Sequence, residues 1–215
     1  MNTKEKPGLR ERKKQQTRLA ISQVATRMFI ERGFDQVTIA EVAAAAEVSV
    51  NTIFNYFVTK EELFFDRSAE VEDAPSRVVR ERRPGESAVA SLQRRFHELG
   101  KEKPGKYASA RIRPFLATIQ ASPELKARLR LLREQSEHRL VETLVEATGK
   151  KPDDPTARVV AALLIGLEWL LIEEYSRQML AGVPEAKLRA SLVRIGERGF
   201  ALLRAGIGDY CTRVS

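Results

Sequence analysis

The sequence contains little cysteine, proline and glycine, and these scarcities limit its possible folds. Cys211 is the one cysteine among 215 residues, so no disulfide can form within the chain, which fits a reducing cytosol. The 12 glycines and 9 prolines lie mostly between segments of helical periodicity, and no segment shows the alternation of apolar and polar residues that is typical of strands. We therefore predict an all-α fold of about nine helices.

Long apolar runs and clusters of catalytic or metal-binding residues are missing as well. The most apolar run, residues 159–172, is 14 residues long and contains Glu168, whereas a membrane span needs about 20 apolar residues. The charged N-terminus is not followed by an apolar stretch, so we expect no signal peptide and a cytoplasmic protein. His97 and His138 lack metal-ligand neighbours, and no nucleophile elbow, glycine-rich phosphate loop or catalytic carboxylate pair is present. We expect neither an enzyme nor a metal, cofactor or membrane partner.

Basic residues are in excess, and they are concentrated near the N-terminus. The chain has 37 Lys and Arg against 29 Asp and Glu, a net charge of +8, and such a surplus attracts phosphate. The first apolar helical pattern begins near Thr17 and ends at Gly33, so we expect the preceding residues to form a disordered arm that can touch phosphates. The basic residues in this region are Lys4, Lys6, Arg10, Arg12, Lys13, Lys14 and Arg18.

Residues 38–60 have the pattern of a helix-turn-helix. Thr38 and Glu41 form a capping box that begins one helix, and Ser49 offers the N-cap of the next after a turn of about three residues. The second helix is apolar at Ile53 and Phe57, and its other side carries short polar residues that can approach base edges and phosphates in a major groove. These polar residues are Ser49, Asn51, Thr52, Asn55 and Tyr56. A second capping box, residues 59–62, begins a fourth helix.

Four motifs in this region resemble the signature of the TetR/AcrR family of transcriptional regulators. They are Val37-Thr38-Ile39, Ala46-Glu47-Val48-Ser49, Thr52-Ile53-Phe54-Asn55-Tyr56-Phe57 and Lys60-Glu61-Glu62-Leu63, in the family's order and spacing within residues 12–66. The resemblance implies a three-helix DNA-binding domain over residues 1–66 and a larger helical domain for effector binding and dimerisation over residues 67–215. It also implies DNA contacts by Thr38, Ser49, Val50, Asn51, Thr52, Asn55, Tyr56 and Lys60.

The sequence departs from the family pattern in the turn and in the recognition helix. The family often has tyrosine at the position of Phe54 and histidine at that of Tyr56, and Phe54 cannot donate a hydrogen bond to phosphate. The turn often contains glycine where Glu47 stands. Either the turn avoids a left-handed residue, or Glu47 adopts that conformation at some energetic cost.

The C-terminal region carries no motif, and its residues leave two interpretations open. Its aromatic residues are ordinary core on general grounds, but the resemblance implies an effector cavity among the middle helices. Candidate walls are Phe96, Phe115 and Trp169, with Arg111 or His138 supplying polarity. Residues 80–85 look like a linker before this region.

The apolar run of residues 159–172 must be buried on several sides. It could be buried within the chain, or it could pair, with the last helix, against a second copy in a four-helix bundle, where Gly166, Gly196 and Gly199 would allow close approach of backbones. The resemblance implies this homodimer, which would match a palindromic operator. We expect a repressor that a small-molecule effector releases from DNA. The alternatives are a transcriptional activator and a helical ligand-binding protein with a vestigial DNA-binding head.

Overall fold

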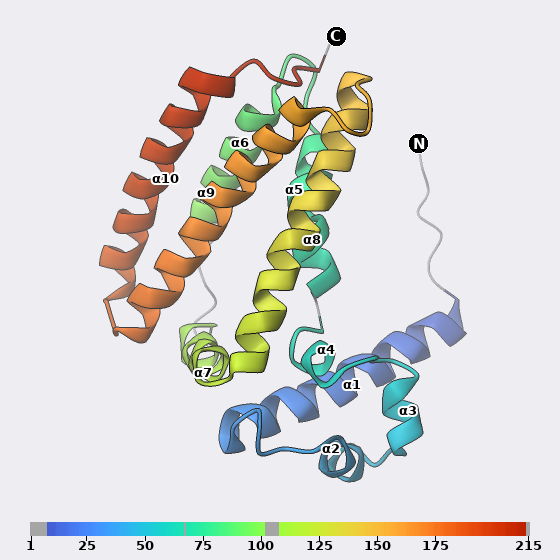
Figure 1. Cartoon of the computed structure of the whole chain (residues 1–215). Helices are drawn as coiled ribbons and strands as arrows, with labels where there is room; N and C mark the ends of the chain where they lie inside the picture. Colours follow the sequence, from blue (N-terminus) through green and yellow to red (C-terminus); the bar gives the residue numbers. More distant parts are fainter. Residues whose placement is uncertain (1–7, 67, 102–107, 214–215) are drawn as a thin grey trace. The chain divides into compact units, whose positions relative to one another are not determined.

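The computed structural model describes residues 8–66, 68–101 and 108–213, and in this part of the chain it contains ten helices and no strand (Figure 1). The helices are α1 (Leu9–Arg32), α2 (Ile39–Ala45), α3 (Val50–Phe54), α4 (Lys60–Phe64), α5 (Ser68–Arg80), α6 (Ala88–Lys101), α7 (Ala108–Ala121), α8 (Pro123–Thr148), α9 (Pro155–Leu180) and α10 (Glu185–Ile207). The predicted all-α class is confirmed. The additional helix arises because the predicted fourth helix stops at Phe64, and α5 begins separately.

The chain forms two compact units. Unit 1 contains the described residues of Met1–Ser68 together with Thr118–Arg128, and unit 2 contains those of Ala69–Ala117 and Leu129–Ser215. The division at Ser68 lies close to the predicted domain boundary. Nothing in the sequence predicted that Thr118–Arg128, the end of α7 and the start of α8, would pack with unit 1.

The core of unit 1 is built on one face of α1. Ile21, Ala25 and Phe29 lie one turn apart on this helix and are at most 1% exposed. Around them α1 packs against α2 and α4, and α2 packs against α3. Phe29 lies 4.9 Å from Phe34, measured between ring centroids. Gly33, with a φ of 90°, ends α1 in a conformation that favours glycine.

The first helix begins earlier than the sequence pattern indicated. It starts at Leu9 rather than near Thr17, so four residues predicted to belong to a disordered arm are helical: Arg10, Arg12, Lys13 and Lys14. Lys4 and Lys6 lie outside the described residues. The apolar pattern missed this stretch because all the described side chains from position 10 to position 16 are exposed and bury nothing against the core.

Unit 2 is organised around α10, against which α9 and α6 pack. Two glycines make the close approach possible. A Cβ atom on Gly196 would lie 2.2 Å from the Phe96 ring, and one on Gly199 would lie 2.3 Å from Leu167 Cδ1. Gly196 and Gly199 therefore accommodate side chains of the same chain, and the prediction that they face a second copy is wrong. Gly166 has no such neighbour within 4 Å.

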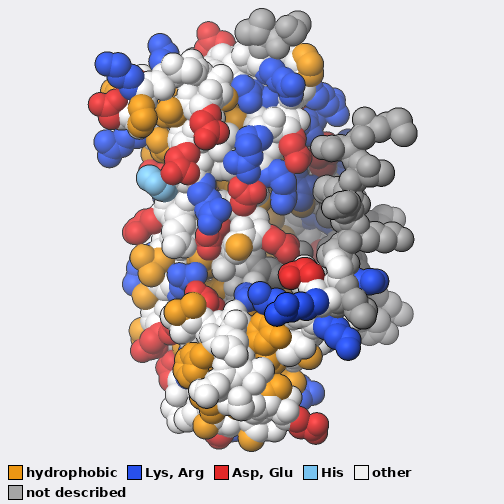
Figure 2. Space-filling view, turned by 90° about the vertical axis from the view of Figure 1, so that its right-hand side faces the viewer, with side chains coloured by type: hydrophobic (Ala, Val, Ile, Leu, Met, Phe, Trp, Pro, Cys, Tyr) orange, Lys and Arg blue, Asp and Glu red, His pale blue; other side chains and the backbone are white. Residues whose placement is uncertain are grey.

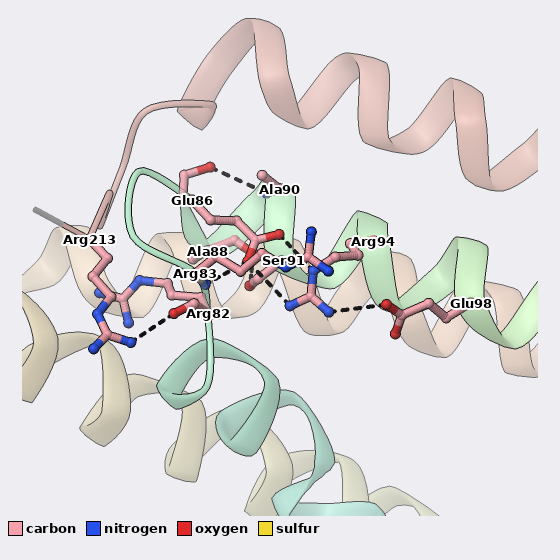
Figure 3. Close-up of polar contacts among 10 residues, drawn as sticks. Arg82, Arg83, Glu86, Ala88, Ala90, Ser91, Arg94, Glu98 and Arg213 are labelled. Carbon is pink, nitrogen blue, oxygen red and sulfur yellow. Dashed lines mark hydrogen bonds and ion pairs between the residues drawn. The ribbon is translucent and has the colours of Figure 1, made fainter. Parts of the chain in front are cut away.

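The predicted linker of residues 80–85 is a fixed corner that holds the C-terminal segment. Arg82 is 6% exposed, and its guanidinium donates to the carbonyl oxygens of Val79 and Cys211 at 2.7 and 3.0 Å. Arg213 donates from Nη1 to the Arg82 carbonyl at 2.9 Å, as Figure 3 shows. In the same view Arg94 pairs with Glu86 at 2.8 Å and with Glu98 at 3.2 Å. Burial raises the pKa of the Cys211 thiol, which suits a structural role for this residue.

Candidate nucleic-acid interface

The turn between α2 and α3 is built by side-chain caps and one left-handed residue. Thr38 and Glu41 form the predicted capping box, and Ser49 Oγ accepts the amide of Thr52 at 3.0 Å at the start of α3. Between the helices Glu47 has a φ of 54°. The turn therefore keeps the conformation for which the family often uses glycine, and the side chain adopts it at some cost in strain.

Helix α3 is fixed on one side and open on the other. Ile53 and Phe57 are at most 1% exposed and anchor it in the core. The opposite side presents Val50, Asn51, Phe54 and Asn55, all exposed to solvent. Such a short helix, whose open face carries two amides beside two apolar side chains, can lie in a major groove, where amides read base edges and apolar groups contact thymine methyls.

Several predicted contact residues already use their polar atoms within the protein. Thr38 Oγ1 donates to Glu41 Oε2 at 2.8 Å and accepts the Glu41 amide at 3.2 Å. The hydroxyls of Ser49 and Thr52 lie 2.8 Å apart, and Thr52 is half-buried. Arg32 bonds Glu41 at 2.6 Å, and this hydrogen bond with those from Thr38 lowers the pKa of Glu41 to about 2. Capping is thus the observed role of these hydroxyls, and their DNA contacts stay predictions.

Arg18 has a structural role that the sequence did not reveal. Its guanidinium bonds Asp66 Oδ1 at 2.7 Å and the Tyr56 carbonyl at 2.6 Å, and lies 4.3 Å from the centroid of the Phe57 ring. It therefore ties α1 to the end of α3 and to the residues after α4. Arg18 is thus unlike the other described basic residues near the N-terminus with which the sequence grouped it, because its donors are taken by partners about 40 to 50 residues away in the sequence.

Lys60 is directed toward the core of unit 1 instead of standing free at the start of α4. Its ammonium lies 4.4 Å from the Phe34 ring centroid and 5.6 Å from that of Phe29. Burial lowers the pKa of Lys60, while the negative charges of Asp35 and of acidic residues around it oppose that shift. A contact between Lys60 and phosphate stays a prediction, and it requires this side chain to leave the aromatic pair.

Phe54 lies on the exposed side of α3, although it was not among the DNA-contacting residues predicted from the sequence. It is 52% exposed beside Asn55, and the neighbouring Val58 is 77% exposed. An exposed aromatic ring on such a helix can contact the methyl group of thymine in the major groove. The signal was available in the helical spacing, since Phe54 lies three and four residues from Asn51 and Val50.

The first two turns of α1 form a basic projection, which we define as Arg10, Arg12, Lys13 and Lys14. All four side chains are exposed, and the acidic residue among them is Glu11. Arg10 and Lys14 continue the stripe of α1 from which Arg18 reaches Tyr56, because these residues are spaced four apart. Figure 2, which looks onto this end of α1, shows basic side chains gathered there. Arg10 and Lys14 thus carry positive charge on the side of α1 from which Arg18 reaches the end of α3.

The candidate effector residues of unit 2 do not form one group. Trp169 is 5% exposed, and Phe96 packs on Phe200 with ring centroids 5.6 Å apart. Phe115 is half-buried, whereas Arg111 is exposed. The His138 side chain is 77% exposed and lies 3.4 Å from Glu142, one turn along α8. Arg111 and His138 therefore face solvent, and the prediction that they supply polarity to an interior cavity is wrong for these conformations.

Asn55→Ala is expected to relax sequence preference at one base pair of the bound DNA. A side-chain amide contacting a base edge contributes discrimination of about 1–3 kcal/mol, and Asn55 is exposed on the open side of α3. Competition binding against a set of single-base operator variants measures the effect. An equal loss of affinity on every sequence would instead identify Asn55 as a phosphate contact.

Comparisons with known proteins identify relatives of this segment and of the chain. Residues 21–66 match the family model described as bacterial regulatory proteins, tetR family. The chain is 25% identical over 193 residues to the HTH-type transcriptional regulator TcmR of Streptomyces glaucescens, with 85% of each protein covered. The solved structure of NalD, the secondary repressor of the MexAB-OprM multidrug efflux pump in Pseudomonas aeruginosa, has a TM-score of 0.55 at 18% identity, covering 86% of this chain and 97% of NalD.

A second solved structure has the same fold. It is a putative TetR-family transcriptional regulator from Mesorhizobium loti, with a TM-score of 0.52 at 20% identity over 88% of this chain and 96% of that protein. The matched segment of residues 21–66 contains the capped α2, the turn and α3. The geometry of unit 1 and the sequence match therefore point to the same segment.

Proposed function

Because the chain belongs to the TetR family of bacterial regulatory proteins, it is a DNA-binding transcriptional regulator, and we propose that it is a homodimeric repressor of a palindromic operator. The observation that carries this proposal is the coincidence of the family match with a capped α2–turn–α3 segment whose second helix is open to solvent. The relatives named above are transcriptional regulators, and NalD is named a repressor.

The homodimer is supported by an unpartnered apolar face on the last two helices. Val159, Leu163 and Leu170 follow one side of α9, and they are 57%, 46% and 51% exposed. Leu202 on α10 is 62% exposed. Helix α9 is long and apolar enough to pass for a membrane span by length and composition, yet only 39% of its most apolar stretch is buried within one chain. An apolar face of this kind fits a second copy of α9 and α10.

The repressor leaves the DNA when a small molecule binds it and stabilises one conformation of the dimer. Such an effector binds in unit 2 and lowers the affinity for the operator by the same coupling free energy with which DNA lowers the affinity for the effector. The segment Thr118–Arg128 supports this link, because it packs in unit 1 while α7 and α8 continue from it into unit 2. Ser122 Oγ bonds Asp35 at 3.0 Å within unit 1.

The proposal is tested by binding the purified protein to its own upstream promoter region across a salt series. We expect tight, selective binding. The logarithm of the association constant should fall linearly with the logarithm of the salt concentration. In the triple variant Arg10→Gln, Lys13→Gln, Lys14→Gln the basic projection neutralises fewer phosphates. The slope should therefore fall by roughly 0.9 for each phosphate that is no longer neutralised, and so by about 2 to 3 in total.

The matched control neutralises three exposed basic residues of unit 2, Arg130→Gln, Arg133→Gln and Lys151→Gln, and should leave the slope unchanged. Weak binding of the wild type, equal on all DNA, would contradict the proposal and favour a ligand-binding protein with a vestigial head. An unchanged slope in the triple variant would show that the basic projection does not contact phosphate.

A further inference from the structure

Glu168 stands on the inward side of α9. It is the one charged residue in the apolar run of residues 159–172. Ala161 lies two turns before it and Leu164 one turn before it on the same face, and both are at most 3% exposed. The exposed Leu163 and Leu170 lie on the other side of the helix. The carboxylate is therefore placed on the face of α9 that forms the core of unit 2.

The Glu168 carboxylate has no partner among the described residues. Two other enclosed carboxylates of unit 2 pair with arginine: Glu72 lies 3.2 Å from Arg139, and Glu86 lies 2.8 Å from Arg94. For Glu168 the described part of the chain offers no hydrogen bond and no ion pair, and the opposing charge that acts on it is that of Arg95 on α6. A carboxylate in these surroundings destabilises the fold unless something compensates it.

The electrostatic environment agrees with this geometry. Burial raises the pKa of Glu168 to about 7, although the charge of Arg95 lowers it. The residue nevertheless keeps part of its surface accessible, as do Leu171 and Tyr175, which follow it along the same side of α9. A group that is removed from bulk water, unpaired and still accessible is suited to bind a ligand that brings the missing charge.

We propose that Glu168 binds the protonated amine of a small-molecule effector, whose apolar body packs against the aliphatic and aromatic side chains on the inward face of α9. The ammonium group supplies the hydrogen-bond donors that the carboxylate lacks among the described residues, and its positive charge adds to that of Arg95. This inference rests on the proposed function, since it names the chemistry of the effector that the repressor requires. It also explains why the otherwise apolar run of residues 159–172 carries a carboxylate on its buried side.

The test compares three probes that share one apolar body and differ in charge. They are 4-phenylbutylamine, 4-phenylbutan-1-ol and 4-phenylbutanoate, titrated at pH 8 into the full-length wild type, Glu168→Gln and Glu146→Gln by calorimetry. Glu146 is an exposed carboxylate of α8 and controls for net charge. We expect the wild type and Glu146→Gln to prefer the amine over the alcohol by about tenfold, and the Glu168→Gln variant to prefer it by less than about twofold.

Retention of the amine preference in Glu168→Gln, or no preference in the wild type, would overturn the inference. Salt-dependent DNA binding is measured on the same preparations and shows that each variant is folded. If the wild type binds its promoter but does not prefer the amine, this inference alone fails. If the wild type binds no DNA selectively, the proposed function fails with it.

Discussion

The double variant Leu163→Glu, Leu170→Glu is expected to be monomeric and to lose most of its operator affinity. Both leucines are about half exposed on one side of α9, so the substitutions leave the core of the chain intact. In the proposed dimer, four carboxylates would then be buried in one apolar interface without partners, which costs several kcal/mol for each unpaired charge. Light scattering after gel filtration should give a mass near 24.2 kDa, that of one chain.

Loss of the dimer should weaken operator binding by two orders of magnitude or more. A monomer has one DNA-binding head and makes half of the contacts. In the dimer, binding of one head holds the other at a high effective concentration above its half-site, which raises the overall affinity by roughly 10²–10⁴. The control variant Val71→Glu, Leu131→Glu alters two equally exposed apolar residues of α5 and α8 and should remain dimeric. A wild type that is itself monomeric, or a double variant that stays dimeric, would show that α9 does not form the interface.

Features set by neighbouring residues could be predicted from the sequence. The capping roles of Thr38, Ser49 and Thr59 are confirmed, because a cap requires only a side chain and an amide three residues later. The second capping box differs in one detail: Glu62 accepts the amide of Val58 rather than that of Thr59. The buried anchors Ile53 and Phe57 were also visible in the helical spacing.

Features that depend on distant parts of the chain could not be predicted. Asp35 meets Ser122 across 87 positions of sequence, and periodicity carries no information about such contacts. The direction of a side chain is equally hidden, since helical spacing fixes neither the approach of Lys60 to the Phe34 ring nor the exposure of His138. The early start of α1 was missed for another reason: its first turns are helical without burying an apolar face, so they leave no amphipathic pattern.

Arg18→Ala is expected to destabilise unit 1 and to weaken DNA binding through α3. The substitution removes the bonds to Asp66 and to the Tyr56 carbonyl and leaves the Asp66 side chain, 13% exposed, without its cationic partner. Loss of a charge-assisted hydrogen bond to an enclosed carboxylate, with the stacking on Phe57, costs on the order of 2–4 kcal/mol. Because the same guanidinium fixes the residues that end α3, operator affinity should fall together with the thermal stability of unit 1.

Two control variants separate this positioning role from a contact with DNA. Arg27→Ala removes the same charge from an exposed position on α1 and should change the melting temperature little. Arg18→Lys keeps the charge but not the planar fork that reaches Asp66 and Tyr56 together, so it should show most of the loss. If Arg18 instead contacted phosphate, Arg18→Ala would lower the salt slope by about one contact and leave melting unchanged, and Arg18→Lys would bind DNA nearly as the wild type does. The melting temperature and the salt slope of these three variants therefore decide whether Arg18 holds α3 in place or contacts the DNA itself.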